Sequence, residues 1–156
     1  MNNKVKKEIE ELIKCYGLNC SVKEFKDKAI WAYIPWYKKL SEDFIREFKE
    51  YLDWTTISET QKFSEEFIRE FKDKVNWRCS SYHQKFSEPF IKEFQSQVDW
   101  KFISMKQMLS EQFIYDFQDK LDIDYLIKNN KINKKRLLEL KEKYGIHSRF
   151  EILDIR

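Results

Sequence analysis

The residue types that most often carry catalysis are sparse in this chain of 156 residues, which holds two histidines and three cysteines. Cys79 and His83 stand four residues apart, the spacing that puts two side chains on one face of a helix. Such a pair can serve as a nucleophile and its base, or as half of a zinc site. No further cysteine or histidine stands nearby in the repeat to complete a tetrahedral site, so we expect two surface residues and no metal or other cofactor.

Acidic side chains recur at a constant spacing, in a column formed by Glu47, Glu70, Glu93 and Asp116. Paired carboxylates can hydrolyse glycosidic bonds, but that reaction needs a cleft. A regular column is better explained as a solvated face. The two glycines, Gly17 and Gly145, leave no way to write a glycine-rich phosphate loop. The sequence therefore predicts a protein that is not an enzyme and has no small-molecule substrate.

The composition indicates a helical protein with a real core. Hydrophobic residues make up 42% of the chain and aromatic residues 17%, while two glycines and two prolines are too few for a hairpin-rich β fold. The net charge of +3 is too even to mark the whole surface as binding nucleic acid. Three cysteines without CxxC spacing, no signal peptide and no apolar window long enough for a membrane span predict an intracellular protein.

The dominant feature of the sequence is an internal repeat with a period of 23 residues. Four types of position follow this period: Trp31, Trp54, Trp77 and Trp100; Ser41, Ser64, Ser87 and Ser110; Phe44, Phe67, Phe90 and Phe113; Phe48, Phe71, Phe94 and Phe117. Two positions depart from the pattern, because Ser80 takes the place of an isoleucine and Ile123 that of a tryptophan.

Each repeat is predicted to form two short helices. The repeated serine is a good N-cap for the first helix, and Asp53, Asn76 and Asp99 are good N-caps for the second. In the second helix, four side chains share one face: Trp54, Ile57, Ser58 and Gln61. We therefore expect the tryptophans to be pillars of the core and the glutamines to link repeats by hydrogen bonds.

These elements predict an all-α fold, a short α-solenoid of helix-turn-helix pairs with N- and C-terminal capping helices. Within a single domain over 1–156, residues 1–21 would form the N-terminal cap, 22–127 the repeat array and 128–156 a basic C-terminal cap. A helix over Lys4–Tyr16 should end at a left-handed Gly17, and another from about Asn133 to Tyr144 should end at Gly145. Pro35 should make its helix kink or restart.

The repeat resembles a short helical repeat of proteins from large DNA viruses and bacteriophages, with the pattern LSExFIxxFxDKVDWxxISxxQ. Residues 40–107 carry this pattern almost in full, and residues 22–132 carry it more loosely. No chemistry or catalytic residue is assigned to that family. The resemblance implies a viral or phage-related interaction protein, such as an inhibitor of a host defence complex, or a structural component of the virion.

The outward positions of the second helices hold side chains that dominate protein interfaces. The candidate protein-binding residues are Tyr33, Trp36, Tyr37, Arg78, Tyr82, His83, Lys101, Phe102 and Met105. A solvated face does not normally carry so many aromatic rings, which favours a protein partner docked along these helices. The alternative is that the terminal caps fold over some of them.

A basic segment near the C-terminus suggests a second kind of partner, RNA or DNA. Its candidate phosphate-binding residues are Lys128, Lys131, Lys134, Lys135, Arg136 and Lys141. Three of them fall in the first turn of the expected C-terminal helix, where cations and free backbone N–H groups together attract anions. The alternative is an ordinary basic capping helix.

Overall fold

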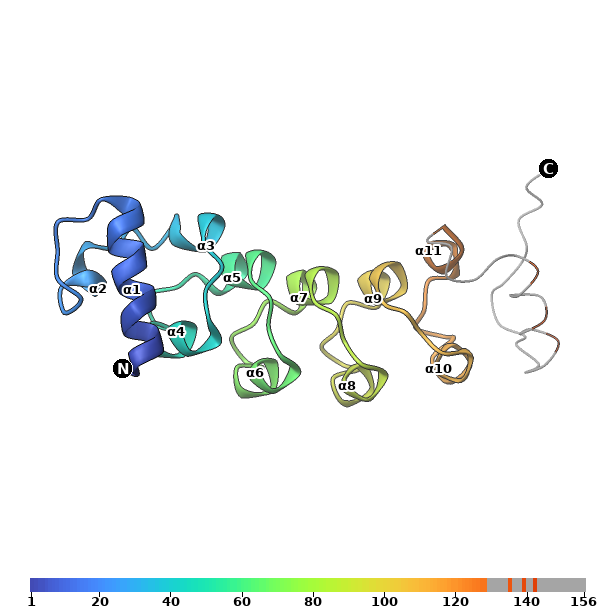
Figure 1. Cartoon of the computed structure of the whole chain (residues 1–156). Coiled ribbons are helices and arrows are strands. Elements are labelled where there is room, and N and C mark those ends of the chain that lie inside the picture. The colour runs from blue at the N-terminus through green and yellow to red at the C-terminus, as the bar shows by residue number, and fades with distance from the viewer. Residues whose placement is uncertain (129–134, 136–138, 140–141, 143–156) are drawn as a thin grey trace. The chain divides into compact units, whose positions relative to one another are not determined.

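The computed structural model of the chain describes residues 1–128 and residues 135, 139 and 142 (Figure 1). All regular structure in this part of the chain is helical, which confirms the all-α class. The helices are α1 (Asn3–Tyr16), α2 (Phe25–Lys28), α3 (Ile34–Tyr37), α4 (Glu42–Glu47), α5 (Trp54–Thr60), α6 (Glu65–Glu70), α7 (Trp77–His83), α8 (Glu88–Glu93), α9 (Trp100–Lys106), α10 (Glu111–Asp116) and α11 (Ile123–Lys128).

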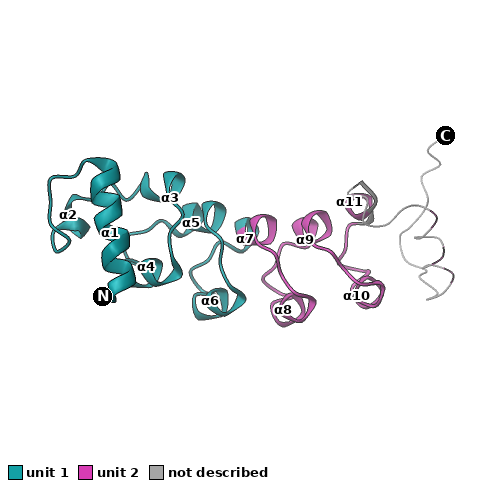
Figure 2. Cartoon of the chain, in the orientation of Figure 1, with its two compact units in different colours: residues 1–79 teal, residues 80–156 magenta. Residues whose placement is uncertain are grey.

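The chain divides into two compact units, residues 1–79 and residues 80–156 (Figure 2). The boundary falls inside α7. In the first unit α1 contacts α4 and α3 contacts α5, and in the second unit α9 contacts α11. In the α3–α5 and α9–α11 pairs, second helices of successive repeats therefore pack on one another. The continuous solenoid and its division at residues 21 and 127 stay predictions.

The expected caps begin the helices of the repeats. The hydroxyls of the first-helix caps accept a hydrogen bond of 3.1–3.3 Å from the phenylalanine amide three residues later, at Ser41, Ser64, Ser87 and Ser110. Asp53, Asn76 and Asp99 cap the second helices in the same way. Helices of six or seven residues are not stable alone in water, so caps and packing between repeats must hold them.

The N-terminal elements also follow the prediction. α1 ends at Gly17, whose φ of 59° is in the left-handed region that glycine adopts without strain. α3 begins at Ile34, and Pro35 lies in its first turn, where a missing N–H costs no helical hydrogen bond. The second helix of this first, degenerate repeat is therefore short. The expected C-terminal helix and Gly145 lie outside the described residues.

The first helices of the repeats supply large side chains to the core of each unit. A phenylalanine and the isoleucine that follows it are fully buried in each of three repeats: Phe44 and Ile45, Phe67 and Ile68, and Phe90 and Ile91. The next phenylalanine along each helix, such as Phe71, is 6–7% exposed. These apolar side chains follow helical spacing and form one buried stripe on each first helix.

The tryptophans, predicted to be pillars of the core, are half-buried and enter the core only in part. Each indole N–H donates to the backbone carbonyl five residues earlier, at distances of 2.9–3.1 Å, and these hydrogen bonds are exposed. One ring face packs on the core, with centroids 5.0 Å apart for Trp54 and Phe71 and 5.2 Å for Trp100 and Phe117. Because the N–H needs a partner, the polar edge of the indole stays at the surface.

Two buried glutamines each link their repeat to the one before it, as expected. In the first unit, Gln61 accepts a hydrogen bond from the Leu40 amide (2.8 Å) and donates to the Pro35 carbonyl (2.7 Å). In the second unit, Gln107 accepts from the Phe86 amide (3.0 Å) and donates to the Gln84 carbonyl (2.9 Å). A side-chain amide therefore satisfies backbone groups that no helix uses.

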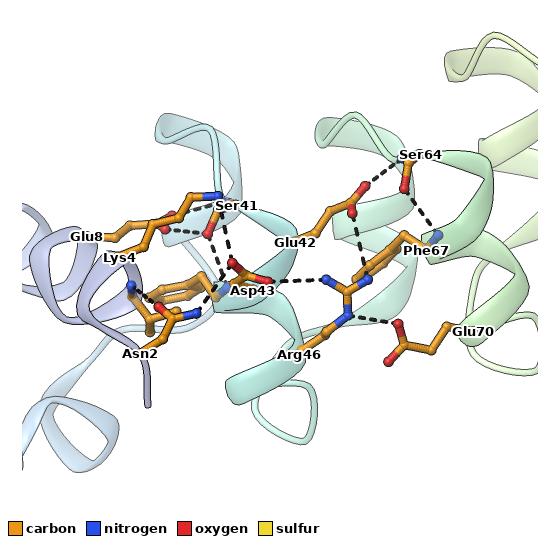
Figure 3. Close-up of polar contacts among 12 residues, drawn as sticks. Asn2, Lys4, Glu8, Ser41, Glu42, Asp43, Arg46, Ser64, Phe67 and Glu70 are labelled. Atoms are coloured by element: carbon orange, nitrogen blue, oxygen red, sulfur yellow. Dashed lines mark hydrogen bonds and ion pairs between the residues drawn. The ribbon is translucent and has the colours of Figure 1, made fainter.

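A second link between repeats joins a carboxylate to the next serine cap (Figure 3). Glu42 accepts from the Ser64 amide at 2.6 Å. Glu8 of α1 does the same for the first cap, accepting from the Ser41 amide (2.9 Å) and hydroxyl (2.6 Å). α1 thus supplies the contact that a preceding repeat would supply, although its sequence does not follow the repeat.

In the first unit, the carboxylates predicted to form a solvated column, Glu47 and Glu70, form ion pairs. The Arg46 Nε lies 2.8 Å from a Glu70 oxygen (Figure 3), and the N-terminal amine lies 3.5 Å from Glu47. The hydrogen bond to Glu70 raises the pKa of the Arg46 guanidinium. The guanidinium also lies 5.0 Å from the centre of the Phe67 ring, so one arginine connects two repeats.

Ser80 is the weak point of the repeat packing, since its side chain is fully buried and its hydroxyl has no hydrogen-bond partner. The equivalent Ile57 and Ile103 are fully buried. We expect Ser80→Ala to raise the free energy of unfolding by about 1 kcal/mol and Ser80→Ile to add about 1–2 kcal/mol through apolar burial. Urea denaturation followed by circular dichroism measures both.

Ser81→Ala is the matched control for this prediction. The Ser81 side chain is equally buried, but its hydroxyl accepts from the Asp99 amide at 3.0 Å. Its removal should therefore lower stability by about 1 kcal/mol. Equal effects of Ser80→Ala and Ser81→Ala would show that the Ser80 hydroxyl is not the defect.

Candidate docking surfaces

The first candidate surface lies on and just before α3 in the first unit. This α3 surface consists of Tyr33, Trp36 and Tyr37, whose side chains are 57%, 55% and 77% exposed. The neighbouring Ile34 and Pro35 are buried and fasten the short helix to the unit. Two adjacent residues therefore face the core, and the residues on either side of them that face the solvent are all aromatic.

The C-terminal end of α1 borders this surface. Burial raises the pKa of the Tyr16 phenol, and the neighbouring Cys15 and Tyr37 add to the shift while Lys38 opposes it. The Lys38 ammonium lies 3.3 Å from Glu11 of α1. This ion pair joins α1 to the residue that follows α3. The described part of the N-terminal cap nevertheless leaves the three aromatic side chains of the α3 surface exposed. The residues of α5 one repeat later, Thr56, Glu59 and Thr60, carry no aromatic ring.

The second candidate surface lies in the second unit and is centred on α9. This α9 surface consists of Tyr82, Lys101, Phe102, Met105 and Lys106. The Tyr82 and Phe102 rings meet edge to face, with centroids 5.1 Å apart and planes at 77°. The Lys106 ammonium lies 4.0 Å from the centre of the Tyr82 ring.

The exposure of the residues on this surface is uneven. Tyr82 is 36% exposed and Lys101 is exposed, whereas Phe102 and Met105 are half-buried. The Lys101 ammonium lies 5.2 Å from the centre of the Tyr125 ring on α11. Sequence reasoning missed Tyr125 as a participant, although it stands one repeat after Phe102. The structure thus brings lysines and aromatic rings together across successive second helices.

The thiol and imidazole of α7 do not form an activated pair. Burial raises the pKa of the Cys79 thiol, the Glu59 carboxylate raises it further, and Arg78 opposes the shift. An activated nucleophilic thiol needs the opposite shift. His83 is half-buried, with its ring 4.7 Å from that of Tyr82, and Arg78 is exposed. No cluster of three or more metal-ligating side chains occurs among the residues described.

The basic C-terminal residues fall almost wholly outside the described part of the chain. Lys131, Lys134, Arg136 and Lys141 lie outside it, as does the side chain of Lys128. Lys135 is exposed. The hypothesis that this segment binds phosphate therefore still rests on the sequence alone.

Comparison with protein-family models, with curated proteins and with solved structures found no match to this chain. The resemblance to a viral and phage repeat therefore stays a prediction from the repeat pattern. Among the described helices, none is long and apolar enough to cross a lipid bilayer.

Proposed function

We propose that the protein is a non-catalytic interaction module that binds a protein partner through the α3 surface and the α9 surface. The observation that carries this proposal is the exposure of three neighbouring aromatic side chains, Tyr33, Trp36 and Tyr37, to between 55% and 77%. Tryptophan, tyrosine and arginine are the residues most enriched among binding hot spots. By contrast, the repeated phenylalanines of the first helices are buried in the core and cannot contact a partner.

The proposed mechanism is steric. Caps, glutamines and carboxylates hold the backbone of these short helices in place, so little backbone conformational entropy is lost on binding. A partner docked on such a surface is blocked at that site or recruited to it. The repeat pattern supports an intracellular viral or phage protein that acts on a host complex in this way.

Replacing Trp36 and Tyr37 by alanine together should abolish binding of the partner. Both side chains are exposed, so the free energy of unfolding should change by less than about 1 kcal/mol, whereas loss of two hot-spot residues weakens binding at least about thirtyfold. The measurement is affinity purification with quantitative mass spectrometry, with circular dichroism as the check on folding.

The matched control replaces Thr55 and Glu59, the outward residues of α5, by alanine. A partner that is enriched by the unchanged protein and by this control, but not by the Trp36 and Tyr37 variant, supports the proposal. Equal recovery of every protein with all three baits would overturn the assignment of the α3 surface.

The two other functions suggested by the sequence, RNA or DNA binding through the basic C-terminal segment and a structural role in a virion, stay predictions. Of the basic residues proposed to contact phosphate, the structure describes the side chain of Lys135 and shows it to be exposed. A fluorescence-anisotropy titration with RNA and DNA at two salt concentrations distinguishes phosphate binding, because that affinity falls steeply with salt.

A further inference from the structure

We infer that the α9 surface binds an acidic segment of the partner protein, with Lys101 and Lys106 pairing with its carboxylates. This inference rests on the proposed function in taking the partner to be a protein. It adds the chemistry of the segment that is recognised. All residues of the α9 surface belong to the second unit.

The two lysines are held in place without being neutralised. The Lys106 ammonium lies over the Tyr82 ring and the Lys101 ammonium over the Tyr125 ring. Neither forms an ion pair with a residue in the described part of the chain, whereas Lys38 and Arg46 of the first unit both do. A cation–π contact orients an ammonium but leaves its full charge, so an incoming carboxylate meets a preordered cation.

Apolar side chains lie between these charges. Phe102 and Met105 belong to the same helix as the lysines and are half-buried. The edge of the Phe102 ring packs against the face of Tyr82 or the reverse, as their interplanar angle of 77° shows. The surface therefore matches a segment in which acidic residues alternate with apolar or aromatic residues.

Two features favour an acidic protein segment over a nucleic acid. Bases bind proteins of this kind by stacking on open aromatic faces, but here lysine ammoniums lie over the rings of Tyr82 and Tyr125. Phosphate backbones also need an extended basic track. On α11 the position equivalent to Lys101 holds Asp124, whose exposed carboxylate places a negative charge where a basic track would need a positive one.

The test uses the full chain and a fluorescein-labelled peptide of twelve residues in which glutamate and tyrosine alternate. Fluorescence anisotropy at 0.15 M salt should show binding, and replacing every glutamate of the peptide by glutamine should weaken it at least tenfold. The double substitution Lys101→Glu and Lys106→Glu should also weaken it at least tenfold. The control Lys72→Glu and Lys92→Glu, which changes two other exposed lysines and gives the same net charge, should alter it less than twofold.

Three results would overturn the inference: no binding of the acidic peptide up to 1 mM, equal loss of affinity in both double variants, or tighter binding of a dodecamer of deoxythymidine than of the peptide. None of them touches the α3 surface. The dependence of partner recovery on Trp36 and Tyr37 tests the proposed function separately, so failure of one can be told from failure of the other.

Discussion

Phe67→Ala should lower the free energy of unfolding of the first unit by about 3–5 kcal/mol, the largest effect we expect of any single substitution. The Phe67 side chain is fully buried. Its ring centroid lies 4.7 Å from that of Phe71 and 4.8 Å from that of Phe63, and the Arg46 guanidinium covers it. Alanine removes all these contacts and leaves a cavity between helices too short to reorganise.

Urea denaturation followed by tryptophan fluorescence measures this effect, because Trp54 packs on the same ring with centroids 6.4 Å apart. Phe63→Ala is the control, since Phe63 is half-buried and its loss should cost about 1–2 kcal/mol. If the two substitutions cost the same, the buried phenylalanine of the first helix is not the centre of the core.

Gln61→Leu should lower the free energy of unfolding by about 2–4 kcal/mol, although leucine is similar in size and more apolar. The side chain of Gln61 is 2% exposed. Its loss leaves the Leu40 amide and the Pro35 carbonyl without the hydrogen bonds of 2.8 Å and 2.7 Å that they now have. A buried backbone group without a partner costs its full desolvation energy.

The control for this prediction is Gln97→Leu, because Gln97 is exposed and accepts a hydrogen bond from the adjacent Ser96. That substitution should change stability by less than about 0.5 kcal/mol. Native-state hydrogen exchange adds a second readout, since the Leu40 amide should exchange much faster in Gln61→Leu. Unchanged exchange there would show that the amide keeps a partner without Gln61.

Much of the candidate site followed from the sequence because the repeat fixes the faces of its helices. Tyr33, Trp36 and Tyr37 stand at positions that do not follow the repeat pattern, and the structure exposes all three. The same reasoning placed Phe102 and Met105 outward, but they are half-buried. Helical periodicity predicts on which side of the helix a side chain lies. Its exposure also depends on the neighbouring helix, and here Tyr82 of α7 packs against Phe102.

The 23-residue repeat can be read directly from the sequence. The sequence by itself also determined the all-α class, the caps and the left-handed Gly17, because each of these depends on residues within about one helical turn of one another. Only the tertiary structure decided that the tryptophans are half-buried, that Glu8 accepts hydrogen bonds from Ser41 and that lysine ammoniums lie over aromatic rings. Those contacts join segments that are distant in sequence, and the distances between packed helices set them rather than local periodicity.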